Sequence, residues 1–136
     1  DVLIALHACD TATDDAIYQG IKSEAKVIVC APCCHQQVRK SMQTAGTLKE
    51  ITRHGILMER EAEIITDSLR ALYLEASGYK TKVMEFISTE HTPKNLLIIA
   101  EKHHKKVDAD VWAKIDSLKD LWGVKEHYLD SFIKQG

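Results

Sequence analysis

The chain has 136 residues, of which 45% are hydrophobic and 28% charged, and its formal net charge is -2. These values fit one globular domain and give no overall case for binding to nucleic acid or to a membrane. No apolar run approaches the ~20 residues of a membrane-spanning helix. The cysteines at 9, 30, 33 and 34 include an adjacent pair, which is an awkward start for a disulfide framework. We therefore expect reduced thiols and a cytoplasmic location.

Two short apolar runs with a helical segment between them open the sequence. Val2–Leu6 and Val27–Ala31 are continuous and rich in β-branched residues, which is typical of strands buried on both faces of a parallel sheet. Polar residues at 10–13 can cap a helix whose apolar face includes Ile17 and Gly20. This order predicts a strand–helix–strand unit with parallel strands.

A mostly polar stretch follows, with a helix start expected at 36–42 and loop or short helical pieces up to residue 56. From Leu57 to Ala76 apolar residues recur at helical spacing, and Gly78 stands where a left-handed cap belongs. These features predict one long helix that ends just before Gly78.

The last third of the chain predicts two strands and a helix. Residues 82–87 and 96–100 are strand-like, and the connection of about six residues between them is too short for a parallel crossover, so this pair should be antiparallel. A helical stripe then runs from Val111 to Trp122 and stops at Gly123, and a short helix is expected at 128–133.

Two strings that follow the first two strands carry a family resemblance. Leu-His-Ala-Cys-Asp-Thr-Ala-Thr-Asp occupies residues 6–14, and Ala-Pro-Cys-Cys-His-Gln-Gln occupies residues 31–37. Together they resemble class I S-adenosylmethionine-dependent methyltransferases of the methyltransferase-like group. They are also similar to tRNA 2′-O-methyltransferases with a Cys-Gly-x-Ala-Thr-Asp string followed by Cys-Cys-His. Thr-Pro-Lys-Asn at 92–95 extends the resemblance over most of residues 1–102.

The resemblance implies a Rossmann-like α/β sheet in the order 3-2-1-4-5-7-6 with the last strand antiparallel. The expected strands of this chain would be strands four, five, six and seven. The implied cofactor is S-adenosylmethionine, held mainly by a glycine-rich turn in the family's N-terminal half. The six glycines here are scattered, and Asp1 leads directly into an apolar strand. We therefore interpret residues 1–136 as the C-terminal half of a methyltransferase domain, which should be inactive alone.

Ligands of an open α/β sheet bind at the carboxyl ends of its strands, so the two strings should meet at one edge. Methyl transfer needs the nucleophile and the methyl group held in line, and sometimes the removal of a proton. On this interpretation the catalytic candidates are His7, Asp10, Cys33, Cys34 and His35. The candidates for contact with the cofactor are His7, Cys9 and Asp10.

Each candidate also has a structural interpretation. His7 could be a packed histidine, Asp10 could cap the following helix, and the cysteines could pack as small hydrophobic residues. The thiols and imidazoles could also form a zinc site, but Cys-Cys-His lacks the two-residue spacer that tetrahedral ligands need, so we predict no metal. A small zinc-binding or interaction domain, or a degenerate methyltransferase fold used as a scaffold, remains the alternative function.

RNA is the acceptor that the sequence favours, because residues 35–60 contain five Lys and Arg against two Glu. A solvated loop would show the same bias, and no aromatic residues are interleaved to stack on bases. The candidates for substrate binding are Lys94, Asn95, Arg39 and Lys40. The half-domain interpretation also predicts that Val2–Leu6 is an unprotected apolar edge through which the chain self-associates.

Overall fold

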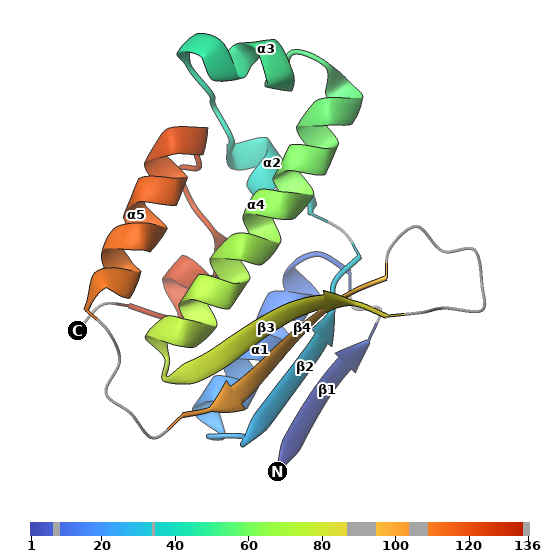
Figure 1. The fold of residues 1–136 in the computed structure, drawn as a ribbon, viewed down its shortest axis with the longest axis vertical. Coiled ribbons are helices and arrows are strands. Elements are labelled where there is room, and N and C mark those ends of the chain that lie inside the picture. Colours follow the sequence, from blue (N-terminus) through green and yellow to red (C-terminus); the bar gives the residue numbers. More distant parts are fainter. Residues whose placement is uncertain (7–8, 34, 87–94, 104–108, 135–136) are drawn as a thin grey trace.

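The computed structural model shows a mixed four-stranded sheet with helices packed against it, in the α/β class that the sequence predicts (Figure 1). The structure describes residues 1–6, 9–33, 35–86, 95–103 and 109–134. None of the helices in these ranges is long and apolar enough to cross a membrane. The elements in chain order are β1 (Val2–Leu6), α1 (Thr11–Lys22), β2 (Val27–Ala31), α2 (Gln36–Ser41), η1 (Gly46–Leu48), α3 (Lys49–Thr52), α4 (Gly55–Ala76), β3 (Tyr79–Glu85), β4 (Leu96–Lys102), α5 (Asp110–Trp122) and η2 (Tyr128–Ser131).

The strands lie in the order β1-β2-β4-β3. β1 and β2 are parallel, as the strand–helix–strand pattern predicts. β3 and β4 are antiparallel, with Tyr79 opposite Lys102 and Glu85 opposite Leu96, so the prediction from their short connection is confirmed. β4 also runs antiparallel to β2. The centre of the sheet therefore consists of β2 and β4, and β1 is an edge strand.

β3 begins three residues before the predicted strand at 82–87 and ends at Glu85. Gly78 has φ 94°, a left-handed conformation that ends α4 and sends the chain directly into the strand. Tyr79 is 4% exposed, and its hydroxyl donates to the Ala25 carbonyl at 2.7 Å. This buried anchor fixes the start of β3, and the hydrophobic pattern of 82–87 did not indicate it.

The end of α5 requires a glycine for two reasons, its backbone conformation and the lack of space for a side chain. Gly123 has φ 64°, and a Cβ atom there would lie 1.7 Å from the Gln43 carbonyl oxygen. The Gln43 N–H donates to the Gly123 carbonyl at 2.8 Å, so the segment after α2 and the end of α5 approach each other backbone to backbone. α5 itself packs on α4, where the rings of Trp112 and Tyr73 lie 6.1 Å apart.

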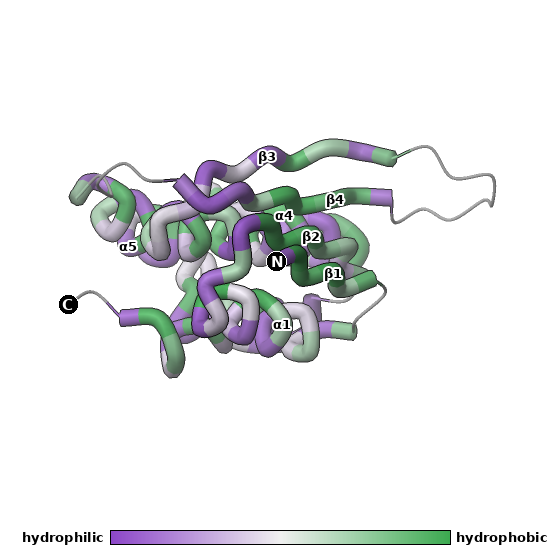
Figure 2. The backbone as a smooth tube through the Cα atoms, turned by 90° about the horizontal axis from the view of Figure 1, so that it is seen from below, coloured by the Kyte–Doolittle hydropathy of each residue, from purple (hydrophilic) through white to green (hydrophobic). Residues whose placement is uncertain are grey.

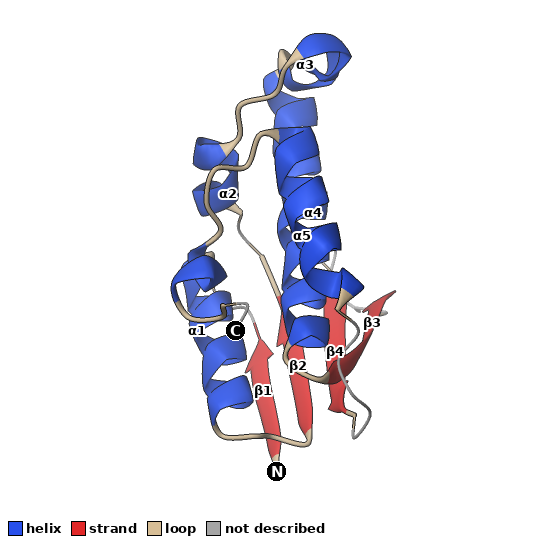
Figure 3. Cartoon of the chain, turned by 90° about the vertical axis from the view of Figure 1, so that its left-hand side faces the viewer, coloured by secondary structure: helices blue, strands red, loops and turns tan. Residues whose placement is uncertain are grey.

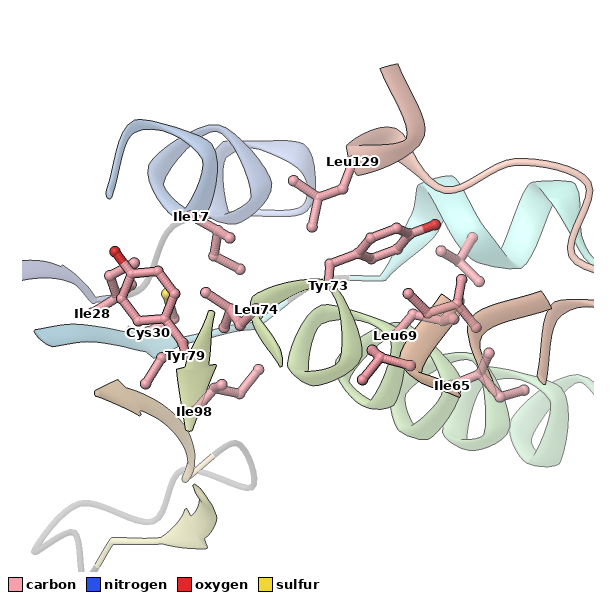
Figure 4. Packing of buried hydrophobic residues seen from close by; sticks show 14 of the residues in the cluster. Ile17, Ile28, Cys30, Ile65, Leu69, Tyr73, Leu74, Tyr79, Ile98 and Leu129 are labelled. Carbon is pink, nitrogen blue, oxygen red and sulfur yellow. The ribbon is translucent and has the colours of Figure 1, made fainter. Parts of the chain in front are cut away.

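α1 and α4 cover the same face of the sheet (Figure 3). Ile28 of β2 and Ile98 of β4 are fully buried on that face, and Ile17 of α1 and Leu74 of α4 close the core over them (Figure 4). Glycine at position 20 lets α1 approach, because a Cβ there would lie 2.7 Å from Cδ1 of Ile28. The core is therefore a two-layer packing of helices on one side of the sheet.

The other face of β1 is apolar and open. Val2 and Ile4 are each 62% exposed and Leu6 is 57% exposed, on a side that no described helix covers (Figure 2). Val2–Leu6 is therefore not buried on both faces in this chain, and the second prediction for it, an unprotected apolar edge strand, is confirmed. Successive side chains of a strand point to opposite faces, so one layer of helices buries only every second residue.

Candidate functional site

The turns after β1 and β2 lie together at the carboxyl ends of the two parallel strands. The Sγ atoms of Cys9 and Cys33 are 3.5 Å apart. The backbone N–H of Gln37, in the first turn of α2, donates to Oδ1 of Asp10 at 3.4 Å. The described residues of the two strings identified in the sequence thus meet at one edge of the sheet.

Asp10 joins the two turns through an unusual backbone conformation. Its φ is 45° and its ψ is -118°, in a region that residues other than glycine seldom occupy. Its side chain makes no capping bond to α1, so the capping alternative is not what the structure shows. Its carbonyl accepts from Nη2 of Arg70 at 3.0 Å. A strained turn of this kind persists only where the surroundings hold it, and here the guanidinium does so.

Arg70, on α4, is the centre of a buried charge cluster beneath the turns. It is fully buried, and its Nε and Nη2 donate to the two carboxylate oxygens of Asp14 at 2.7 and 3.1 Å. Its Nη1 donates to Oδ1 of Asp67 at 3.0 Å. Burial acts to lower the pKa of the guanidinium, but the bonds and charges of Asp14 and Asp67 outweigh it and raise that pKa. Arg70 is therefore a fixed cation.

His35 completes the cluster from the turn after β2. Its Nε2 lies 3.1 Å from Oδ2 of Asp67, and the two side chains are 5% and 11% exposed. Its Nδ1 is buried and has no hydrogen-bond partner among the described residues. The cluster holds two carboxylates and one guanidinium, and it becomes neutral when His35 carries a proton. A carboxylate–imidazole pair of this kind can hold or accept a proton.

A cavity of about 390 Å³ opens beside this pair, and we call it the α4 cavity. His35 and Asp67 line it, together with Glu85 at the end of β3 and Asn95 just before β4. The cavity therefore lies between α4 and the β3–β4 end of the sheet, next to the turn after β2.

The predicted substrate residues do not gather in one place. Asn95 lines the α4 cavity, and its Nδ2 donates to the Phe86 carbonyl at 3.2 Å, so it also fastens the end of the β3–β4 pair. Arg39 lies elsewhere and pairs with Glu59 at 3.2 Å. Lys40 lines a second, polar hollow of about 570 Å³ that reaches Asp10. The structure thus separates Asn95 from the basic pair on α2.

Three predicted site residues, His7, Cys34 and Lys94, lie outside the described residues. Cys9 is exposed, whereas Cys30 is buried inside β2 and burial raises the pKa of its thiol to about 12. Over the described ranges, no three His, Cys, Asp or Glu side chains are arranged to hold a metal ion. Of the cysteines described, only Cys9 and Cys33 therefore lie where the two turns meet.

Two residues of the cluster, Asp67 and Arg70, were missed from the sequence. They lie one helical turn apart on the side of α4 that also buries Tyr73 and Leu74. Their signal in the sequence was an oppositely charged pair at i and i+3, outside the predicted apolar stripe of the helix. Asp14, in the first turn of α1, belongs to the same cluster and is buried to 2% exposure against Arg70.

Comparison with known proteins gives a match in the segment that contains both turns. Residues 1–41 match a family model described as a methyltransferase domain, and this segment carries both turns. The match supports part of a methyltransferase domain. The proteins called glutathione S-transferase C-terminal domain-containing protein in Homo sapiens and Macaca fascicularis are each 28% identical over 123 residues. The alignment covers 71% of this chain, which spans about a fifth (19%) of each relative. No solved structure matches.

Proposed function

We propose that this chain is the C-terminal part of a class I S-adenosylmethionine-dependent methyltransferase domain and carries the acceptor side of its active site. The observation behind the proposal is the meeting of the two turns, both inside the matched segment 1–41, at the carboxyl ends of parallel strands. In this assignment β1, β2, β4 and β3 correspond to strands four, five, seven and six of the family's sheet. That sheet binds its ligands at this same edge.

The residues of this chain fit one wall of a cofactor site. Cys9 and Asp10 directly follow β1, and Asp10 presents a carboxylate there, but no glycine-rich turn is available to cradle the rest of the cofactor. S-adenosylmethionine, when bound, supplies an electrophilic methyl group. We propose that the other wall belongs to an N-terminal half-domain, and that residues 1–136 alone do not transfer methyl groups.

His35 has the surroundings of a group that accepts a proton from the methyl acceptor. Asp67 lies on its Nε2 side and is itself held by Arg70, so the imidazole is fixed in orientation. A general base must be held in a fixed orientation and come within hydrogen-bond reach of the proton that it removes. Cys33, near this pair but beside the exposed Cys9, is a second candidate to contact the acceptor.

RNA is the acceptor that we propose, with the polar hollow as a contact for its backbone. Lys40 and Lys125 line this hollow together with the acidic residues Asp10 and Glu126, so two ammonium groups and two carboxylates stand beside the turns. Lysine side chains that neutralise phosphates give an affinity that falls steeply with salt. Arg39 pairs with Glu59 and is not among the residues that line this hollow.

Methyl transfer from labelled S-adenosylmethionine to cellular RNA by the full-length protein tests the proposal. We expect His35→Gln to reduce transfer by at least about 100-fold, the usual scale of general-base removal. The exposed His54 provides the matched control, because His54→Gln should leave transfer unchanged. Full activity of the His35→Gln protein would contradict the role of His35. Tight cofactor binding by residues 1–136 alone in calorimetry would contradict the half-domain assignment.

A further inference from the structure

We propose that the α4 cavity binds a nitrogen-containing ring with an exocyclic amino group, such as an amino-bearing nucleobase, and not a phosphate. The inference rests on the proposed function, since it names the part of the acceptor that enters beside His35. It is carried by the charge of the cavity, by its size and by the hydrogen-bonding state of His35.

The charges around the cavity select against anions. Glu63, Asp67 and Glu85 line it, and no Lys or Arg stands among the described residues of its lining. Asp67 is partly balanced by Arg70, whereas Glu85 ends β3 with its side chain exposed. Carboxylates accept hydrogen bonds from amino groups, as they do from the exocyclic amine of cytosine, and they repel phosphate.

Apolar side chains complete the cavity and set the shape of its ligand. Ile64 of α4, Val83 of β3 and Leu96 of β4 line it. Its volume of about 390 Å³ is near the lower end of the ~300–1,000 Å³ that small-molecule sites usually have. An apolar slot of this size with polar groups around it suits one flat ring system, with the sugar and phosphate left outside.

His35 specifies a hydrogen-bond donor on the ligand. Asp67 receives a bond from Arg70 on one oxygen, and its other oxygen faces Nε2 of His35, so neutral His35 carries its proton on Nε2. The Nδ1 atom is then an acceptor, and it is the atom left buried without a partner among the described residues. An N–H group of the ligand satisfies this acceptor once the neighbouring side chains move slightly, because the atom is buried in this structure, whereas a carbonyl or phosphate oxygen cannot satisfy it.

Calorimetric titration of the full-length protein with cytidine, adenosine, uridine and inorganic phosphate tests the inference. We expect the two amino-bearing nucleosides to bind at least 10-fold more tightly than uridine, and phosphate not to compete with them. Equal binding of uridine, or competition by phosphate, overturns the proposal. Absence of binding by cytidine and adenosine up to millimolar concentration overturns it as well.

Two matched pairs of variants locate the binding. Ile64→Trp should fill the cavity and weaken nucleoside binding at least 10-fold, whereas Ile56→Trp, on the same helix and similarly exposed, should not. Glu85→Gln should weaken binding about 5-fold, whereas Glu101→Gln, an exposed glutamate of β4 outside the cavity lining, should not. Circular dichroism confirms that each variant is folded. Equal effects within a pair would show that the nucleosides bind elsewhere and overturn the assignment.

Methyl transfer, measured separately, distinguishes this inference from the proposed function. If the full-length protein methylates RNA and Ile64→Trp does not change that rate, the cavity assignment fails and the function stands. If nucleosides bind in the cavity and no RNA is methylated, the function fails and the cavity assignment stands. Competition of a short cytidine-containing RNA with cytidine shows whether the ring comes from an RNA strand or from a free nucleoside.

Discussion

The two faces of the sheet differ in how much of their apolar surface this chain covers. On the helix side Ile28 and Ile98 are fully buried, and a complete set of charge partners surrounds Arg70. On the other side Val2 and Ile4 remain 62% exposed although β1 is as apolar as β2. The covered face is thus packed as a domain interior, whereas the open face exposes apolar side chains of β1 to solvent.

The largest effect is expected from removing the buried cation. Arg70→Met leaves Asp14 and Asp67 buried without their partner, and breaking a buried pair in this way costs about 3–5 kcal/mol of unfolding free energy. Urea unfolding of residues 1–136 measures the loss. Arg53→Met is the matched control, because Arg53 is 62% exposed in its pair with Glu50 and should contribute less than about 1 kcal/mol. Equal losses would mean that the cluster does not stabilise the covered face.

The second largest effect is expected from pH, because the buried His127 should make the unfolding free energy depend on it. Burial lowers the pKa of His127 from 6.5 to about 4, so the unfolded chain takes up the proton first as the pH falls. Stability should therefore be complete above pH 6.5 and should decline by about 3 kcal/mol as the pH falls to about 4. Urea midpoints between pH 7.5 and 4 measure this slope.

His127→Asn should flatten that slope, because an Asn side chain can accept the Leu129 N–H bond that Nδ1 of His127 accepts at 3.1 Å, and it does not titrate. His54→Asn, at an exposed position, should leave the slope as it is in the parent chain. A slope that survives His127→Asn would assign the dependence to other groups.

Replacing two glycines by alanine should change the unfolding free energy by smaller amounts, and in opposite directions at the two positions. At position 20 an added Cβ meets Cδ1 and Cγ1 of Ile28 at 2.7 and 2.8 Å, whereas at position 55 it meets nothing within 4 Å. Gly20→Ala should therefore cost about 1 kcal/mol, since the overpacking exceeds the gain in helix propensity. Gly55→Ala should be neutral or stabilise by up to about 1 kcal/mol. Thermal melts of both variants provide the comparison, and a stabilised Gly20→Ala would show looser packing under α1.

Much of the covered face could be predicted from the sequence. The spacing of apolar residues distinguishes helices from strands, and a glycine marks a position where the backbone takes a left-handed conformation. The strand–helix–strand unit, the antiparallel final pair and the cap at Gly123 followed from these signals. The charge cluster did not, because Asp and Arg are rarely buried and the pairing of Asp14 with Arg70 joins residues 56 positions apart. The left-handed turn at Asp10 was also unpredictable, since it depends on the guanidinium that holds its carbonyl.

The smallest effect on stability is expected at the open face. Val2, Ile4 and Leu6 are already more than half exposed, so replacing all three by Thr keeps β-propensity and should change unfolding by less than about 1 kcal/mol. We propose that residues 1–136 self-associate through the exposed apolar side chains of the edge strand β1, because an uncovered apolar patch on such a strand recruits other chains.

The triple variant should therefore shift the chain toward monomer in sedimentation velocity while its melt hardly changes. Leu121→Thr, at an exposed leucine of α5, should leave the association unchanged. An association that persists in the triple variant would place the contact elsewhere. A large loss of stability would show that the exposed residues of β1 belong to this chain's own core, and the contrast between the two faces would then fail.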